Sequence, residues 1–126
     1  MSKISILYVE DYPVVQQMYA SVLKQQFDVD VVADGKLALE KTKAKDYDII
    51  LLDLLLPQVG GVEFLEAYNK EHKNSKKTRI IILSDFDHPS TVKRTKELGV
   101  DDYWMKVDTA PHALVEKLGK LPKPQA

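Results

Sequence analysis

Short runs of apolar residues alternate along the chain with longer segments in which apolar residues recur at helical spacing. Runs rich in β-branched, aromatic and other apolar residues predict strands over residues 4–9, 29–32, 48–53, 79–84 and 101–105. The third and fourth runs are nearly continuous in Ile and Leu, which is typical of parallel strands covered on both faces. Amphipathic patterns predict helices over residues 13–26, 35–45, 62–72, 89–99 and 110–121.

Individual residues support these boundaries. Pro13 suits the first turn of the first helix, and Gly99 is the expected C-terminal stop of the fourth. Within the first helix, the apolar residues from Val14 to Leu23 recur at helical spacing, and we expect this stripe to face the core.

Five strand–helix units in series predict an α/β fold, in which a parallel sheet carries helices on both faces. In such sheets, ligands bind beyond the carboxyl ends of the strands, near the switch point in strand order. With 126 residues, the chain is expected to form one domain over residues 1–121. Residues 122–126 are expected to be a short C-terminal tail, either a frayed end or the start of a linker to a second domain.

Composition narrows the classes of function. The net charge of −1 gives no global basic field for nucleic acid, so we expect no direct nucleic-acid partner. The absence of cysteine excludes a disulfide framework, a thiol nucleophile and a thiolate metal site. The first residues are too polar for a signal peptide, and no apolar run approaches a membrane span. A cytoplasmic protein without a membrane partner is therefore expected.

Polar residues stand where the predicted strands end. Glu10 and Asp11 follow the first strand, Asp53 closes the third, Ser84 ends the fourth and Lys106 follows the fifth. Taken singly, each has an ordinary structural explanation, such as a helix cap, a turn residue or a surface lysine. Together they would converge at one edge of the sheet, where three carboxylates repel one another unless a cation is present. An all-oxygen ligand set of this kind suits Mg²⁺.

Four stretches, in this order and spacing, resemble a receiver domain of the two-component response regulators. They are "VED" (residues 9–11), "LLDLLLPQVGG" (51–61), "IIILS" (80–84) and "GVDDYWMK" (99–106). The resemblance covers nearly the whole chain. It implies a doubly wound five-stranded parallel sheet with the flavodoxin-like strand order 2-1-3-4-5 and five helices.

The resemblance also implies a role for each site residue. Asp53 is the expected phosphoacceptor, and Mg²⁺ is expected to be held by Asp11, Asp53 and the backbone carbonyl of Leu55, with Glu10 acting through water. Ser84 and Lys106 stand where the family has the hydroxyl and the ammonium that contact the phosphoryl group. Ser84 and Tyr103 are the expected switch residues, Tyr103 at the aromatic position that moves inward on activation.

The chain departs from the family pattern at several positions. Val107 follows Lys106 where a proline, often cis, is usual, and Asp85 follows Ser84 where a small residue is common. We expect Asp85 either to lie near the phosphoryl group and repel it or to cap the next helix. Leu55 and Phe86 stand where the family borders the approach of hydrolytic water. Because neither side chain can hydrogen-bond water, we expect a long-lived phosphorylated form.

The expected function is a phosphorylation-controlled signalling switch of the single-domain type. It would take a phosphoryl group from a sensor histidine kinase or a phosphotransfer protein and signal by binding a downstream protein. It would not be an enzyme beyond its own phosphoryl transfer and slow autodephosphorylation.

Three alternatives stay open at this point. A flavodoxin-like cofactor binder needs a phosphate-binding loop after the first strand, where Glu10 and Asp11 would repel phosphate. A phosphatase of the haloacid dehalogenase type needs a second Asp where Leu55 stands. A degenerate receiver that binds partners without phosphorylation is kept open by Asp85 and Val107.

Overall fold

The chain forms a five-stranded, entirely parallel sheet. A computed structural model describes residues 3–72 and 78–121. The strands lie in the order β2-β1-β3-β4-β5, which confirms the predicted doubly wound topology. Their bounds are β1 (Ser5–Val9), β2 (Asp28–Val32), β3 (Ile49–Leu52), β4 (Arg79–Ser84) and β5 (Asp102–Met105).

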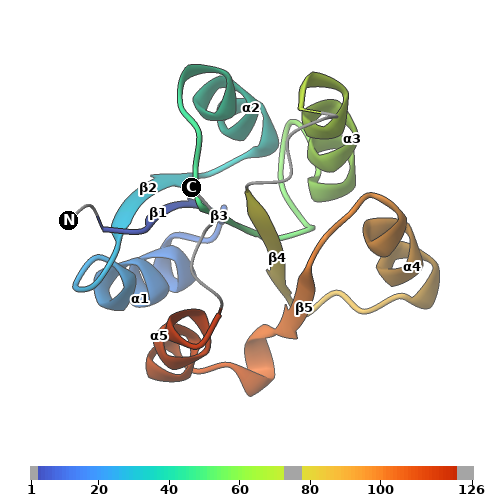
Figure 1. Ribbon diagram of the computed structural model, residues 1–126. Helices are drawn as coiled ribbons and strands as arrows, with labels where there is room; N and C mark the ends of the chain where they lie inside the picture. Colours follow the sequence, from blue (N-terminus) through green and yellow to red (C-terminus); the bar gives the residue numbers. More distant parts are fainter. Residues whose placement is uncertain (1–2, 73–77, 122–126) are drawn as a thin grey trace.

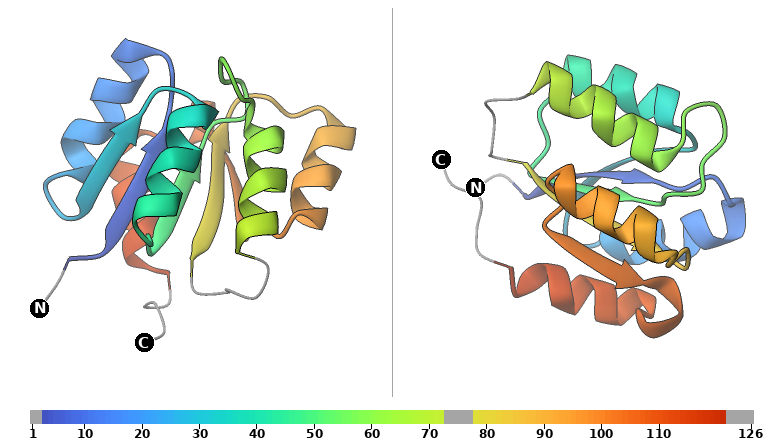
Figure 2. Two further views of the ribbon diagram at one scale, coloured as in Figure 1. Left: turned by 90° about the horizontal axis from the view of Figure 1, so that it is seen from above. Right: turned by 90° about the vertical axis from the view of Figure 1, so that its right-hand side faces the viewer.

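Helices cover both faces of this sheet (Figures 1 and 2). They are α1 (Pro13–Leu23), α2 (Gly35–Ala44), α3 (Gly61–Glu71), α4 (Pro89–Glu97) and α5 (Pro111–Gly119), with a short 3₁₀ helix, η1 (Lys106–Asp108), after β5. Helices α1 and α5 pack together on one face, whereas α2 and α3 lie on the other and α4 contacts α3. Five helices in two layers were predicted, and the structure confirms them.

All four residues of strand β3 are buried, so this strand lies at the centre of the core. Ile49 and Leu51 face the cluster beneath α1 and α5, whereas Ile50 and Leu52 face the cluster beneath α2 and α3. This explains the continuous apolar run, since a strand covered on both faces has no position for an exposed polar side chain. The first polar residue after it, Asp53, comes where the strand leaves the sheet.

The predicted apolar stripe of α1 is partly wrong. Tyr19 and Leu23 are buried as expected, but Val14 is 68% and Met18 is 45% exposed. Val14 and Met18 are four residues apart and therefore share a helix face, turned away from the face of Tyr19 and Leu23 that meets the sheet. The helix also ends at Leu23 rather than at residue 26.

The other helix boundaries were predicted to within two residues. Pro13 lies in the first turn of α1, as predicted. Gly99 has a φ of 88°, a left-handed conformation that suits glycine, and ends the fourth helical segment as predicted. None of the helices in the described ranges is long and apolar enough to cross a membrane. The tail predicted over residues 122–126 lies outside the described residues.

Candidate functional site

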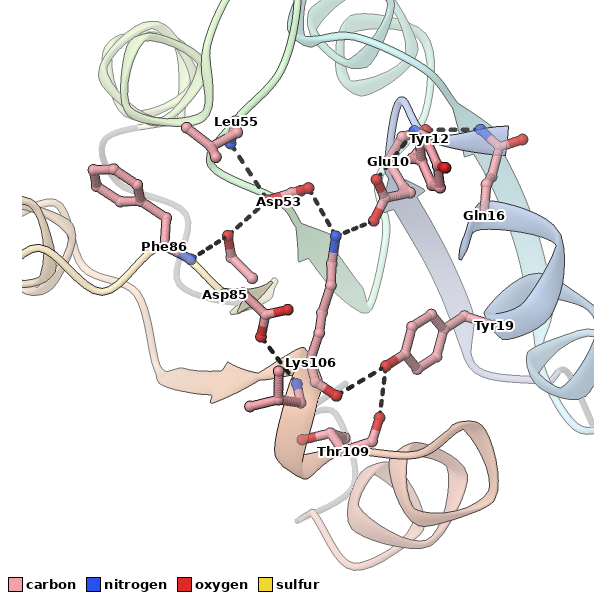
Figure 3. A network of polar contacts seen from close by, with 12 residues as sticks. Glu10, Tyr12, Gln16, Tyr19, Asp53, Leu55, Asp85, Phe86, Lys106 and Thr109 are labelled. Carbon is pink, nitrogen blue, oxygen red and sulfur yellow. Dashed lines mark hydrogen bonds and ion pairs between the residues drawn. The ribbon is translucent and has the colours of Figure 1, made fainter. Parts of the chain in front are cut away.

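Asp53 is the centre of the polar cluster at the carboxyl edge of the sheet. The residue is only 6% exposed, yet both of its carboxylate oxygens accept hydrogen bonds. Oδ1 accepts from the Ser84 hydroxyl at 2.7 Å and from the backbone N–H of Leu55 at 3.3 Å, and Oδ2 accepts from Lys106 Nζ at 2.9 Å (Figure 3). These contacts fix the orientation of a nearly buried carboxylate, as its desolvation requires.

Two further carboxylates lie beside Asp53. Oxygen atoms of Glu10, Asp11 and Asp53 all lie within 4.8 Å of one another. Glu10 is buried and Asp11 is exposed, so the cluster runs from the interior to the surface. Neither acid caps α1, which begins without a side-chain cap, although Glu10 Oε2 accepts a hydrogen bond from the N–H of Tyr12 at 3.1 Å.

Lys106 bridges two of these acids. Its ammonium lies 2.9 Å from Asp53 and also forms an ion pair with Glu10. Burial raises the pKa of Glu10, and the contacts of Lys106 and Tyr12 offset this only in part. Burial alone would favour the neutral amine of Lys106, but the bonds to Glu10 and Asp53 outweigh it and raise the pKa of Lys106. The lysine is therefore held charged between the acids.

The turn after β5 is fixed by contacts that the sequence did not reveal. The hydroxyl of Tyr19 donates to the backbone carbonyl of Thr109 at 2.6 Å and lies 3.5 Å from that of Lys106. Asp85 Oδ1 accepts from the backbone N–H of Val107 at 2.9 Å. The bond between Lys106 and Val107 is trans. Asp85 does not cap α4, because His88 holds that position.

A model of the response regulator receiver domain matches residues 6–118 of the chain. The chain belongs to this family. The flavodoxin-like and haloacid dehalogenase alternatives are thereby set aside. The fold of this chain, with strand order 2-1-3-4-5, is the one that the resemblance to receiver domains implied.

Curated response regulators resemble this chain in sequence. The response regulator protein VraR of Staphylococcus saprophyticus is 36% identical over 110 residues, which are 85% of this chain and 51% of that protein. VraR of Staphylococcus aureus is 34% identical over the same share of each chain. The chain thus spans about half the length of these curated relatives.

Solved receiver-domain and response-regulator structures resemble this chain in fold. The chemotaxis protein CheY4 of Vibrio cholerae matches with a TM-score of 0.84 and 26% identity, over 96% of this chain and 100% of that one. A CheY-like receiver domain of Methanospirillum hungatei has a TM-score of 0.83 and 26% identity, over 94% and 93%. A DNA-binding response regulator of the LuxR family from Staphylococcus aureus has a TM-score of 0.78 and 25% identity, over 93% and 97%.

In this receiver domain, a chain of hydrogen bonds leads from Asp53 toward β5. The Ser84 hydroxyl donates to Asp53 and also accepts from the backbone N–H of Phe86 at 3.3 Å. The backbone carbonyl of Phe86 in turn accepts from the hydroxyl of Tyr103. The half-buried Tyr103 packs against the core cluster beneath α2 and α3. The two predicted switch residues are therefore connected through the loop before α4.

The loop after Asp53 turns back tightly onto the end of β3. A Cβ atom on Gly61 would lie 2.6 Å from the Cα of Leu54 and 2.8 Å from the carbonyl oxygen of Asp53, so only glycine fits at this close approach. Gln58 in this loop has a φ of 67°, which is uncommon for a residue with a side chain. Leu55 is 60% exposed, whereas Phe86 is half-buried against the core.

Proposed function

We propose that this receiver domain is a phosphorylation-controlled switch in which Asp53 accepts the phosphoryl group. The observation that carries the proposal is the carboxylate of Asp53, held between the Ser84 hydroxyl and the Lys106 ammonium and beside Glu10 and Asp11. A nearly buried aspartate with a hydroxyl and an ammonium on its two oxygens has the groups that phosphoryl transfer requires.

The proposed transfer is a displacement at phosphorus. An oxygen of ionised Asp53 forms a bond to phosphorus, while the bond from phosphorus to an imidazole nitrogen of the donor histidine breaks. The electron pair of that bond leaves with the nitrogen. Lys106 and Ser84 already contact the carboxylate oxygens, so short movements would bring them to the phosphoryl oxygens, where they would stabilise the negative charge.

The acidic cluster fits Mg²⁺ as the required cation. Glu10, Asp11 and Asp53 offer only oxygen ligands, the kind that Mg²⁺ prefers, and the exposure of Asp11 leaves room for water ligands. Asp11, Asp53 and the backbone carbonyl of Leu55 would hold the ion directly, with Glu10 acting through water. When bound, the ion would supply positive charge that screens the phosphoryl oxygens.

Partners of two kinds follow from this proposal. A sensor histidine kinase or a phosphotransfer protein would supply the phosphoryl group, and a downstream protein would bind the phosphorylated form. The bonds that link Ser84, Phe86 and Tyr103 support a signal that leaves through α4 and β5. We further propose that the domain itself contacts neither nucleic acid nor membrane and acts in the cytoplasm.

The donor chemistry gives a direct test of the proposal. Phosphoramidate carries its phosphoryl group on nitrogen, as phosphohistidine does, and can replace the unidentified kinase. After incubation with phosphoramidate and Mg²⁺, the intact protein should gain the mass of one phosphoryl group, and chelation of Mg²⁺ should prevent the gain. A wild-type protein that gains no mass under these conditions would instead favour the degenerate receiver.

A further inference from the structure

The two main departures from the family pattern contact each other. Asp85 stands where a small residue is common, and Val107 stands where proline is usual. Asp85 Oδ1 accepts a hydrogen bond from the backbone N–H of Val107 at 2.9 Å. Proline has no N–H, so this bond can form only because valine replaces it.

The bond joins the two loops that carry the groups on Asp53. Asp85 directly follows Ser84, whose hydroxyl bonds Asp53 Oδ1, and Val107 directly follows Lys106, whose ammonium bonds Oδ2. The bonds therefore close a ring that runs from Asp53 through one loop and back through the other. Figure 3 shows Asp85 reaching from its loop to the turn that begins at Lys106.

In the described part of the chain, this is the one hydrogen bond that the Asp85 side chain makes. Asp85 is exposed, forms no ion pair with any described residue and does not cap α4. At the other end of this turn, the Tyr19 hydroxyl donates a hydrogen bond to the backbone carbonyl of Thr109 at 2.6 Å. The turn from Lys106 to Thr109 is thus fixed at its beginning by Asp85 and at its end by Tyr19.

We propose that Asp85 is a positioning residue, which acts through the backbone of Val107 to hold Lys106 against Asp53. It fixes this turn through a hydrogen bond, which a proline at position 107 would remove because proline has no N–H. The inference rests on the proposed function, because its consequence for rate requires that Asp53 accept a phosphoryl group. Asp85 touches no reacting atom and is therefore not a catalytic residue.

Four variants separate this role from an effect of charge. Asp85→Asn keeps an acceptor oxygen but removes the charge, and Asp85→Ala removes both. Val107→Pro removes the donor, and Val107→Ala, which keeps the N–H, is its matched control. The rate of phosphorylation by acetyl phosphate is measured at saturating Mg²⁺, together with the Mg²⁺ dissociation constant of each variant.

The hydrogen bond predicts a specific pattern of rates. Asp85→Ala and Val107→Pro should be slower by roughly three- to tenfold, the range that corresponds to one hydrogen bond, with unchanged Mg²⁺ affinity. Asp85→Asn and Val107→Ala should stay within about twofold of wild type, which lies below that range. The double variant of Asp85→Ala with Val107→Pro should be no slower than the slower single variant. Equal effects of Asn and Ala at position 85, or additive losses in the double variant, would overturn the proposal.

A second readout does not depend on phosphorylation. Hydrogen exchange of the Val107 amide and the NMR signal of the Lys106 ammonium report the bond and its consequence in the unphosphorylated protein. Asp85→Ala should speed the exchange of the Val107 amide hydrogen and that of the Lys106 ammonium hydrogens with water. Asp85→Asn should speed neither. If wild type takes up no phosphoryl group, the proposed function fails and these signals still test Asp85. If both signals are unchanged in Asp85→Ala, the positioning role is wrong.

Discussion

The ammonium of Lys106 lies 2.9 Å from Oδ2 of Asp53, although 53 residues separate them in the chain. The same ammonium forms an ion pair with the buried Glu10. One cation thus neutralises part of a site that holds three carboxylates. We expect the balance of these charges to determine how the site responds to pH and, under the proposed function, to Mg²⁺ and to a phosphoryl group.

Replacing Lys106 should destabilise the fold in a pH-dependent way. In Lys106→Met, the free energy of unfolding without Mg²⁺ should fall by about 2 kcal/mol at pH 7, less than for a fully buried pair because Lys106 is partly exposed. Glu10, whose pKa burial already raises, loses the contact that lowered it, so its pKa rises further. The folded state then binds the proton more tightly than the unfolded chain does, and stability is regained as pH falls through this raised pKa.

Urea unfolding at neutral and mildly acidic pH measures this effect. The difference between wild type and Lys106→Met should shrink as the pH falls below neutral, because Glu10 takes up its proton. Lys36→Met, at an exposed position of α2, is the control and should change stability little at either pH. A Lys106→Met deficit that is constant across this range would contradict the assigned contact with Glu10.

Magnesium should stabilise the folded protein. Only the folded state brings Glu10, Asp11 and Asp53 together, so binding adds about 2.7 kcal/mol at a hundredfold excess over the dissociation constant. The melting temperature should therefore rise with millimolar MgCl₂ but not with NaCl of equal ionic strength. Asp11→Ala should lose most of this rise, whereas Asp46→Ala, at an exposed acid outside the cluster, should keep it. Equal rises in both variants would exclude Asp11 as a ligand.

The signal should travel through Phe86 to Tyr103. Beryllofluoride, which mimics a phosphoryl group, should shift the amide signals of Ser84, Phe86 and Tyr103, because hydrogen bonds connect these three residues. It should also shift the signals of α4, because the loop that holds Phe86 leads into this helix. In Tyr103→Phe, the hydroxyl that bonds the Phe86 carbonyl is absent, so the shifts on β5 should become smaller while those beside Asp53 persist. Wild-type shifts confined to the surroundings of Asp53 would count against this route.

Much of the site could be predicted from the sequence because parallel strands deliver their carboxyl ends to one edge. Asp53, Ser84 and Lys106 each follow or end an apolar run, so their convergence follows from topology alone. The apolar pattern of the first helix wrongly predicted that Val14 and Met18 would face the core. Apolar spacing does not say which of two adjacent helix faces meets the sheet.

Contacts between loops could not be predicted in this way. Nothing in the sequence pairs Asp85 with the N–H of Val107 or Tyr19 with the carbonyl of Thr109, because backbone groups carry no residue-specific signal. The left-handed φ of Gln58 is similar, since glycine or asparagine would be expected at such a position. The departures at residues 85 and 107 were visible, but only the fold brings them together.

The phosphorylated form should be long-lived. Under the proposed function, water would approach phosphorus past Leu55 and Phe86, and neither apolar side chain could orient it. After removal of the donor, the variant with Leu55→Asn and Phe86→Glu should lose its phosphoryl group several-fold faster than wild type. A second variant with alanine at both positions opens the path without supplying polar groups and should decay more slowly than the polar pair. Equal decay of wild type and the polar variant would show that these residues do not set the lifetime.

The central claim is that Asp53 is the phosphoacceptor, and one comparison tests it most directly. Wild type and Asp53→Asn are incubated with acetyl phosphate and Mg²⁺, and the intact mass of each is followed over time. The amide keeps the size of the side chain but loses the nucleophilic carboxylate. We predict that wild type gains the mass of one phosphoryl group and that Asp53→Asn gains none. A comparable gain at a comparable rate in Asp53→Asn would contradict the assignment.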